Sequence, residues 1–170
     1  DLAQRQHWSS LTSRSRSHPQ EIPHRDAQGF NVFHWACFNQ PPLRVIRSLL
    51  HNAADDDDGG GEGTAAALTP DNDGLTPLHY ACCCHASPGV VYEIVARHPE
   101  AAILRDTGGW TPLHYVYSRV GRSSNGENCV DIARILLRQS PSIALWKSRD
   151  GRCPLMLLLE RYENEVTEVV

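Results

Sequence analysis

The chain has 170 residues, a length that suits one compact domain or one short repeat array and is too short for two full domains. Sixteen basic and twenty acidic residues give a net charge of −4, and the arginines are scattered rather than gathered in a stripe. We therefore do not expect nucleic-acid binding, which needs a strong positive field. No apolar run approaches the roughly eighteen residues of a membrane-spanning helix, so we expect no membrane contact within this segment.

The six cysteines are interpreted as reduced thiols, because a domain of this size can bury a core of its own and the chain shows no secretory leader. We therefore expect an intracellular protein, most simply a cytoplasmic one. No cofactor is expected.

The first predicted element is a helix over residues 4–17 with Trp8 and Leu11 on its apolar side, and Ser17-His18-Pro19 ends it. A short motif then recurs four times, each copy with a glycine five residues before its last position. The copies are Asn31-Val32-Phe33-His34, Thr76-Pro77-Leu78-His79, Thr111-Pro112-Leu113-His114 and Cys153-Pro154-Leu155-Met156. After two insertions are removed, one near residues 55–63 and one near 120–126, the copies share a period of about 35 residues, which indicates a repeat architecture.

Each unit is predicted to read turn, helix, turn, helix. An aspartate eight residues before the last motif position in the first three copies, with the glycine three residues after it, is typical of a tight turn. Thr-Pro then begins a helix, with the threonine as N-cap and the proline at the first helical position. A second helix follows with a repeated apolar stripe, for example Val90-Val91 with Ile94-Val95, and ends at a proline such as Pro99.

These spacings predict three complete units and two partial ones. The predicted ranges are 1–25 for an N-terminal capping helix and partial repeat, 26–70 for the first repeat with its acidic Gly-rich insertion 55–63, 71–105 for the second, 106–147 for the third with a loop insertion near 120–126, and 148–170 for a C-terminal partial repeat.

The motif Thr76-Pro77-Leu78-His79-Tyr80-Ala81 resembles the ankyrin repeat family, whose T-P-L-H-x-A pattern it matches in full. The copy at Thr111 departs only at its last position, and the outer copies match in part. The resemblance implies an all-α solenoid of stacked helix-turn-helix repeats with protruding β-turn or hairpin loops. It also implies that the histidine in each motif is a structural hydrogen bonder that ties its turn to the neighbouring repeat.

Two clusters invite a metal interpretation, and we favour a structural one for both. His34, His79 and His114 recur once per repeat, roughly 10 Å apart by helix-packing distances, which is too far to share an ion. Cys82-Cys83-Cys84-His85 contains ligand types that zinc prefers, but adjacent helical residues point about 100° apart. Cys37 and Cys82 are predicted to be core residues, whereas a reactive or metal-binding role for Cys83 and Cys84 remains open. No metal site is predicted.

The acidic run Asp55–Gly63 is interpreted as a solvated insertion. Asp71, Asp73 and Gly74 fail the calcium-loop pattern, because Thr69 stands at its first position and Tyr80 stands where a glutamate is required. No nucleophile motif, phosphate loop or H-E-x-x-H pattern is present, so we expect no catalytic residues and no enzyme.

The predicted function is that of a protein-interaction module, binding an unidentified protein as a monomer. The resemblance places partner-binding residues on the turns and first helices: Gln28, Phe30, Phe38, Asn39, Asn72, Asp73, Leu75, Cys83, Cys84, Thr107, Trp110, Ser118 and Arg119, with Ala27 and Gly108 in the same turns. Phe30, Leu75 and Trp110 share one register and are candidate hot spots; alternatively, these side chains pack between adjacent turns. A second functional hypothesis is a regulatory segment of a larger enzyme, channel or transferase that contacts its own chain.

Overall fold

The computed structural model describes residues 2–52, 65–119 and 126–167, with side chains described for residues 8–52, 65–118 and 128–160. Eight α-helices and three short 3-10 helices make up the regular structure of these residues, so the all-helical prediction is confirmed. In chain order they are α1 (Leu2–Ser17), η1 (Pro19–Glu21), α2 (Val32–Phe38), α3 (Leu43–Asn52), α5 (Pro77–Cys83), α6 (Pro88–Arg97), η2 (Pro99–Ile103), α7 (Pro112–Arg119), α8 (Gly126–Gln139), η3 (Pro141–Leu145) and α9 (Pro154–Thr167). Residues 55–63 and nearly all of 120–126, where the two insertions are predicted, lie outside the described residues.

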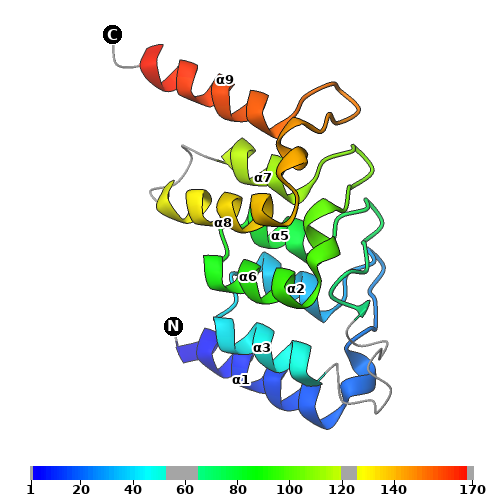
Figure 1. The fold of residues 1–170 in the computed structure, drawn as a ribbon. Helices are drawn as coiled ribbons and strands as arrows, with labels where there is room; N and C mark the ends of the chain where they lie inside the picture. The colour runs from blue at the N-terminus through cyan, green and yellow to red at the C-terminus, as the bar shows by residue number, and fades with distance from the viewer. Residues whose placement is uncertain (1, 53–64, 120–125, 168–170) are drawn as a thin grey trace.

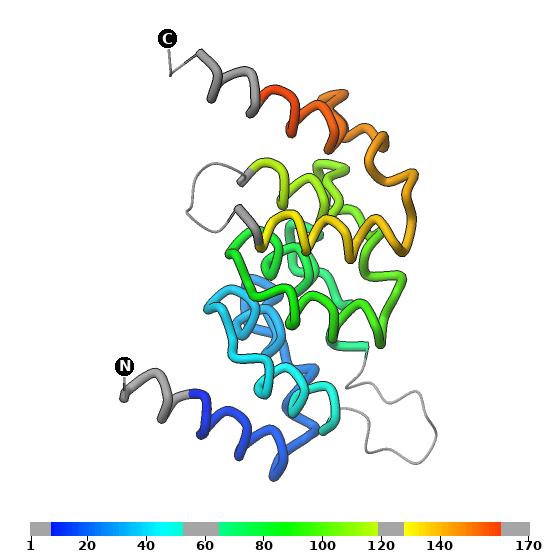
Figure 2. The backbone as a smooth tube through the Cα atoms, turned by 60° about the vertical axis from the view of Figure 1, so that its left-hand side comes forward, coloured from blue at the N-terminus to red at the C-terminus, as the bar shows by residue number. Residues whose placement is uncertain are grey.

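The helices stack in two rows (Figure 1). The inner row is α2, α5, α7 and α9, in which each helix contacts the next. The outer row is α1, α3, α6 and α8, again in contact along the row, and each of α3, α6 and α8 also packs on the inner helix that precedes it in the chain. This is the paired stacking of helix-turn-helix repeats. Seen from the second direction, α1 and α9 lie at opposite ends of the stack (Figure 2).

The inner helices begin as the motif predicts. Thr76 is the N-cap of α5 with an extended backbone, Pro77 occupies the first helical position, and Thr76 and His79 form a reciprocal capping box. Asn31 replaces the threonine in the first copy, and its side chain accepts hydrogen bonds from the amides of Phe33 and His34. The degraded copy therefore keeps the cap, because asparagine is as good an N-cap as threonine.

The outer helices bury one apolar face. In α3 the stripe Val45-Ile46 with Leu49-Leu50, which corresponds to Val90-Val91 with Ile94-Val95 in the next repeat, is fully buried. The corresponding positions of α6 and α8 are buried or half-buried, and Trp8 and Leu11 of α1 pack on the same core. A single continuous core thus runs between the two rows.

At the end of three outer helices the chain forms a further short helix. The proline at these positions predicts only that the outer helix ends. After His18, His98 and Ser140 it forms the 3-10 helices η1, η2 and η3. Each brings small or aliphatic residues to the core, and Ile22, Ala101 and Ile143 are buried there. The sequence analysis did not predict these helices, because a proline marks only where the preceding helix ends.

The last helix is longer than its apolar start suggests. α9 begins at Pro154, as the fourth motif copy predicts. It continues beyond its apolar first turns, through a segment rich in glutamate, as far as Thr167. It contacts α7 as an inner helix does, and Leu155 and Leu159 on it are 39% and 55% exposed.

Candidate functional site

The first three of the four turns are closed by one aspartate each. Asp71 Oδ1 accepts hydrogen bonds from the amides of Asp73 and Leu75, both at 2.9 Å. Asp26 and Asp106 make the same two bonds in their own turns. The backbone also closes between the amide of Asp71 and the carbonyl of Leu75 at 2.8 Å. The predicted Asp-x-x-Gly turns are confirmed.

Adjacent turns are joined by their backbones as well. The amide of Asn72 donates to the carbonyl of Gln28 at 3.1 Å, and that of Thr107 to the carbonyl of Asp73 at 3.0 Å. The approach is close enough that a Cβ atom added at Gly74, where φ is +83°, would lie 2.8 Å from the Thr107 amide nitrogen. Glycine is therefore required both by its backbone angle and by its neighbour.

The motif histidines make the hydrogen bonds that the resemblance implies. In the second repeat Nδ1 of His79 accepts the amide hydrogen of Thr76 at 3.0 Å, so the ring proton lies on Nε2. That Nε2–H donates to the carbonyl of Trp110 in the next turn at 3.2 Å. His34 and His114 bond to the carbonyls of Leu75 and Arg152 in the same way. Burial lowers the pKa of His79 to about 4, which keeps the imidazole neutral.

The sequence analysis did not predict a second contact that recurs in the repeats. The residue after each motif histidine is aromatic in the first three copies, and its polar edge donates to the turn aspartate nine residues earlier. Tyr80 Oη lies 2.7 Å from Asp71 Oδ2, and Tyr115 and Trp35 make the equivalent bonds to Asp106 and Asp26. Burial, together with the adjacent carboxylate, raises the pKa of Tyr80. These clamps fix each turn against its inner helix.

The predicted partner-binding residues lie along the turns and inner helices, with different degrees of exposure. Exposed members are Gln28, Phe38, Asn39, Asn72, Asp73 and Thr107; half-buried members are Phe30, Leu75, Cys83, Cys84, Trp110 and Ser118. Arg119 ends α7, and its side chain lies outside the described residues. Asn72 has a structural contact of its own, because its side chain donates to the carbonyl of Ala27 at 2.9 Å. We call this set the turn-helix surface.

The apolar row of the turn-helix surface consists of Phe30, Leu75 and Trp110. Its two aromatic rings pack on the inner helix of their own repeat. Phe30 stacks on His34 with ring centroids 5.3 Å apart, and it lies 5.0 Å from Tyr80 of the next repeat. Trp110 lies 5.5 Å from His114 and 5.2 Å from Tyr115. Both rings are therefore half-buried and in contact with other rings.

The cysteines separate as predicted into core and surface positions. Cys37 and Cys82 are buried, and burial raises the pKa of the Cys37 thiol to about 12. None of the six cysteines forms a disulfide. Cys83 and Cys84 are half-buried, and His85 adopts a left-handed backbone at φ 58° where α5 ends. Within the described residues no group of three or more His, Cys, Asp or Glu side chains is placed to hold a metal ion.

The sequence was compared with models of known protein families. Residues 62–116 match the family model for ankyrin repeats (many copies), so this part of the chain consists of ankyrin repeats, a non-catalytic module that generally binds proteins. A comparison with curated proteins finds no match. Across the part of the chain that the structure describes, no helix is long and apolar enough to cross a bilayer.

Proposed function

We propose that the chain is a protein-interaction module whose turn-helix surface binds a partner protein, with the ring of Trp110 as the central anchor. The supporting observation is that Phe30, Leu75 and Trp110 repeat at one register and are half-buried, with the rings of Phe30 and Trp110 packed on the buried histidines His34 and His114. An aromatic ring that is already held in place loses little conformational freedom on binding, which is typical of a hot spot.

The backbone of Trp110 makes two hydrogen bonds that do not involve its ring. Its amide donates to Asp106 and its carbonyl accepts from His79. Trp110→Ala keeps both backbone bonds. It removes the hydrogen bond of the indole to Asp150 and the packing of the ring on His114 and Tyr115, which contributes roughly 1 kcal/mol beyond the area it buries. The variant is therefore expected to lose some stability, and binding is compared at a temperature at which the variant is still folded.

The test uses Trp110→Ala in a capture experiment from cell lysate, with thermal unfolding measured on the same samples. We expect a marked loss of captured partner at a temperature where the unfolding curve shows that the variant is still folded. Tyr92→Ala, at a 58% exposed aromatic residue on the outer helix α6, is the control and should leave capture unchanged. Unaltered capture with a large loss of stability would show that the ring only packs between turns.

We extend the proposal to the oligomeric state, the repeat boundaries, the absence of catalysis and the location of the chain. We propose a monomeric array with the repeat ranges predicted from the sequence and no catalytic activity, located inside the cell, where six cysteines without a disulfide remain reduced. A full chain that holds the turn-helix surface against another of its own domains would favour regulation in cis instead.

A further inference from the structure

The outer helices carry most of the arginines in the described part of the chain. The described side chains of α1, α3, α6 and α8 include seven arginines and two carboxylates, those of Glu93 and Asp131. The other described side chains include five basic and eight acidic residues. The arginines are scattered along the sequence, but the fold gathers positive charge on one row of helices.

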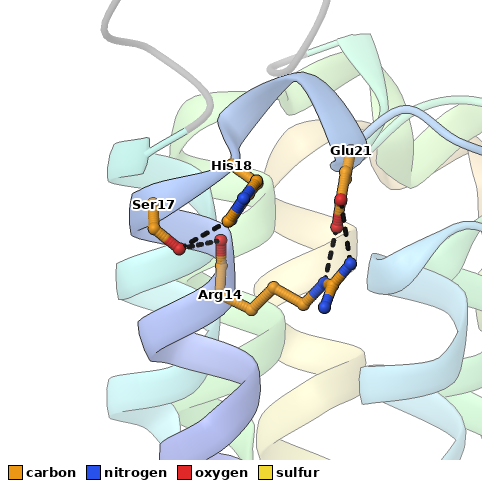
Figure 3. A network of polar contacts seen from close by, with 4 residues as sticks. All are labelled: Arg14, Ser17, His18 and Glu21. Carbon is orange, nitrogen blue, oxygen red and sulfur yellow. Dashed lines mark hydrogen bonds and ion pairs between the residues drawn. The ribbon is translucent and has the colours of Figure 1, made fainter.

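One of the seven arginines is neutralised within the chain. Figure 3 shows Arg14 of α1 paired with Glu21 of η1, whose carboxylate lies 2.7 Å from the Nε atom of the arginine. The other six arginines are exposed, and we call them the outer basic surface. They are Arg16 on α1, Arg44 and Arg47 on α3, Arg97 on α6, and Arg134 and Arg138 on α8.

Helix periodicity places these arginines on the solvent side of the outer row. Arg47 follows Val45, the first residue of the buried stripe of α3, by two positions, which is about 200° around the helix. Arg134 has the same place relative to Ile132 in α8. The two arginines therefore share one register, with α6 packed between their helices. Packed helices lie about 8–10 Å apart, so Arg47 and Arg134 are separated by roughly 20 Å along the stack.

The two carboxylates within the outer basic surface do not cancel its charge. Glu93 lies 2.9 Å from Arg47 and 3.6 Å from Arg97, so one carboxylate is shared by two arginines. Asp131 pairs with Arg134 at 2.8 Å. Exposed pairs of this kind are weak and are screened by salt, so these arginines remain available to a partner.

Three further arginines add to the positive excess. Arg16, Arg44 and Arg138 form no ion pair with another residue in the part of the chain that the structure describes. Glu100, in η2 beyond the end of α6, lies 3.6 Å from His98 and pairs with none of the six. Six guanidinium groups thus share two carboxylates.

Charge complementarity indicates the chemistry of the partner. Guanidinium groups bind carboxylates and phosphates alike, but Glu93 and Asp131 lie among the arginines. A nucleic-acid strand has a phosphate every few ångströms and would bring negative charge against both carboxylates. A protein can place its carboxylates opposite the arginines alone. The distance between Arg47 and Arg134 is spanned by about fourteen residues of an α-helix, at 1.5 Å per residue.

We propose that the outer basic surface binds an acidic helix of a separate partner protein, which lies across α3, α6 and α8 with its carboxylates on one face. Carboxylates about fourteen residues apart pair with Arg47 and Arg134, and their neighbours pair with Arg44 and Arg138. Electrostatic attraction of this kind speeds association and weakens with salt. The site is separate from the turn-helix surface, so neither proposal depends on the other.

The probe is a labelled peptide of about 21 residues, long enough to cross three outer helices. It consists of alanine, glutamine and six glutamates, which are spaced alternately by three and four residues along one helical face. A control peptide has the same composition with its glutamates spread around the helix, and circular dichroism checks that both are helical. Fluorescence anisotropy measures binding to the full 170-residue chain.

We expect saturable binding at about 50 mM salt, at least about threefold tighter for the one-face peptide than for its control. Binding should weaken at least about tenfold at about 300 mM salt, where the Debye length is shorter.

Matched charge reversals establish where the peptide binds. Arg47→Glu combined with Arg134→Glu should weaken binding at least about tenfold. The control combines Lys147→Glu with Arg149→Glu, at two exposed residues between η3 and α9, and changes the net charge equally. It should alter binding less than about twofold, because only the long-range field changes.

Thermal unfolding shows whether each double variant is folded. If the Arg47 and Arg134 variant does not fold, Arg44→Glu combined with Arg138→Glu replaces it. This second variant removes no ion pair with a described residue and should weaken binding by a similar factor.

Three results would overturn the proposal. The first is a helical one-face peptide that does not bind, or that loses affinity equally in the two sets of charge reversals. The second is a chain that ignores the peptide but binds duplex DNA or phosphatidylserine vesicles through Arg47 and Arg134, which would identify a different class of partner. The third is peptide binding that requires replacement of the five acidic residues of the insertion 55–63 by their amides. That result would identify the chain's own insertion as the occupant.

Discussion

Nε2 of His79 donates a hydrogen bond to the carbonyl oxygen of Trp110, 31 residues further along the chain and in the next turn, at 3.2 Å. The same imidazole accepts the amide hydrogen of Thr76 in its own repeat. One ring thus joins the start of an inner helix to the turn that follows in the stack. Since its equivalents at His34 and His114 do the same, the histidines connect the repeats in series.

We predict that His79→Ala destabilises the chain by about 2–3 kcal/mol, because a buried amide and a buried carbonyl each lose a partner. Urea unfolding followed by circular dichroism measures the change. The control is His24→Ala at an exposed position, expected to stay within roughly 0.5 kcal/mol. Equal effects at the two positions would contradict the structural role of His79.

The same histidine predicts a pH dependence. Its pKa falls from the ordinary value of 6.5 to about 4 in the folded chain because the ring is buried. The unfolded chain therefore binds this proton more tightly, so the stabilisation is complete above pH 6.5 and is lost as the pH falls to about 4. The difference corresponds to about 3 kcal/mol from this residue.

Urea unfolding between pH 7.5 and pH 4 tests this prediction. His79→Gln cannot titrate in this range, so its stability should fall less steeply with decreasing pH than that of the unmodified chain. The remaining slope should come partly from His34 and His114, whose pKa values burial also lowers. Identical slopes for the variant and the unmodified chain would show that His79 is not held neutral by the fold.

The sequence predicts the parts of this fold that depend on local chemistry. The cap at Thr76, the turn at Asp71 and the buried stripe of α3 each follow from a few neighbouring residues. The histidine contact to the next turn could be anticipated only through the family resemblance. Its acceptor is a backbone carbonyl that leaves no mark in the sequence.

Other features depend on packing between distant segments. The bond from Tyr80 to Asp71 has a detectable signal, an aromatic residue nine positions after each turn aspartate, but its meaning appears only when the turn folds over the helix. The groove between α1, η1 and α2 has no sequence signal, because it is produced by the packing of these three elements against one another. Surface exposure at Phe38 and Trp110 likewise depends on neighbours in adjacent repeats.

The clamp between Tyr80 and Asp71 gives a third prediction. Tyr80→Phe removes one hydrogen bond to a carboxylate and leaves the ring packing intact, so we expect a loss of about 1–2 kcal/mol. Tyr115→Phe should cost a similar amount, because Tyr115 makes the same bond to Asp106. Tyr92→Phe, the same substitution at an exposed residue, should cost nothing measurable by urea unfolding. A cost shared by all three variants would argue against the clamp.

The glycines that close the turns give the fourth prediction, because two of them share a backbone angle and differ in their surroundings. Gly74 and Gly151 have φ of +83° and +81°. A Cβ atom at Gly74 would lie 2.8 Å from the Thr107 amide nitrogen, whereas one at Gly151 would meet nothing within 4 Å. Gly151→Ala should therefore cost only the backbone strain, about 1–2 kcal/mol. Gly74→Ala should cost an additional 1–3 kcal/mol or so, because the next turn must move away. Urea unfolding of both variants measures the difference, and equal losses would mean that the contact between adjacent turns yields without cost.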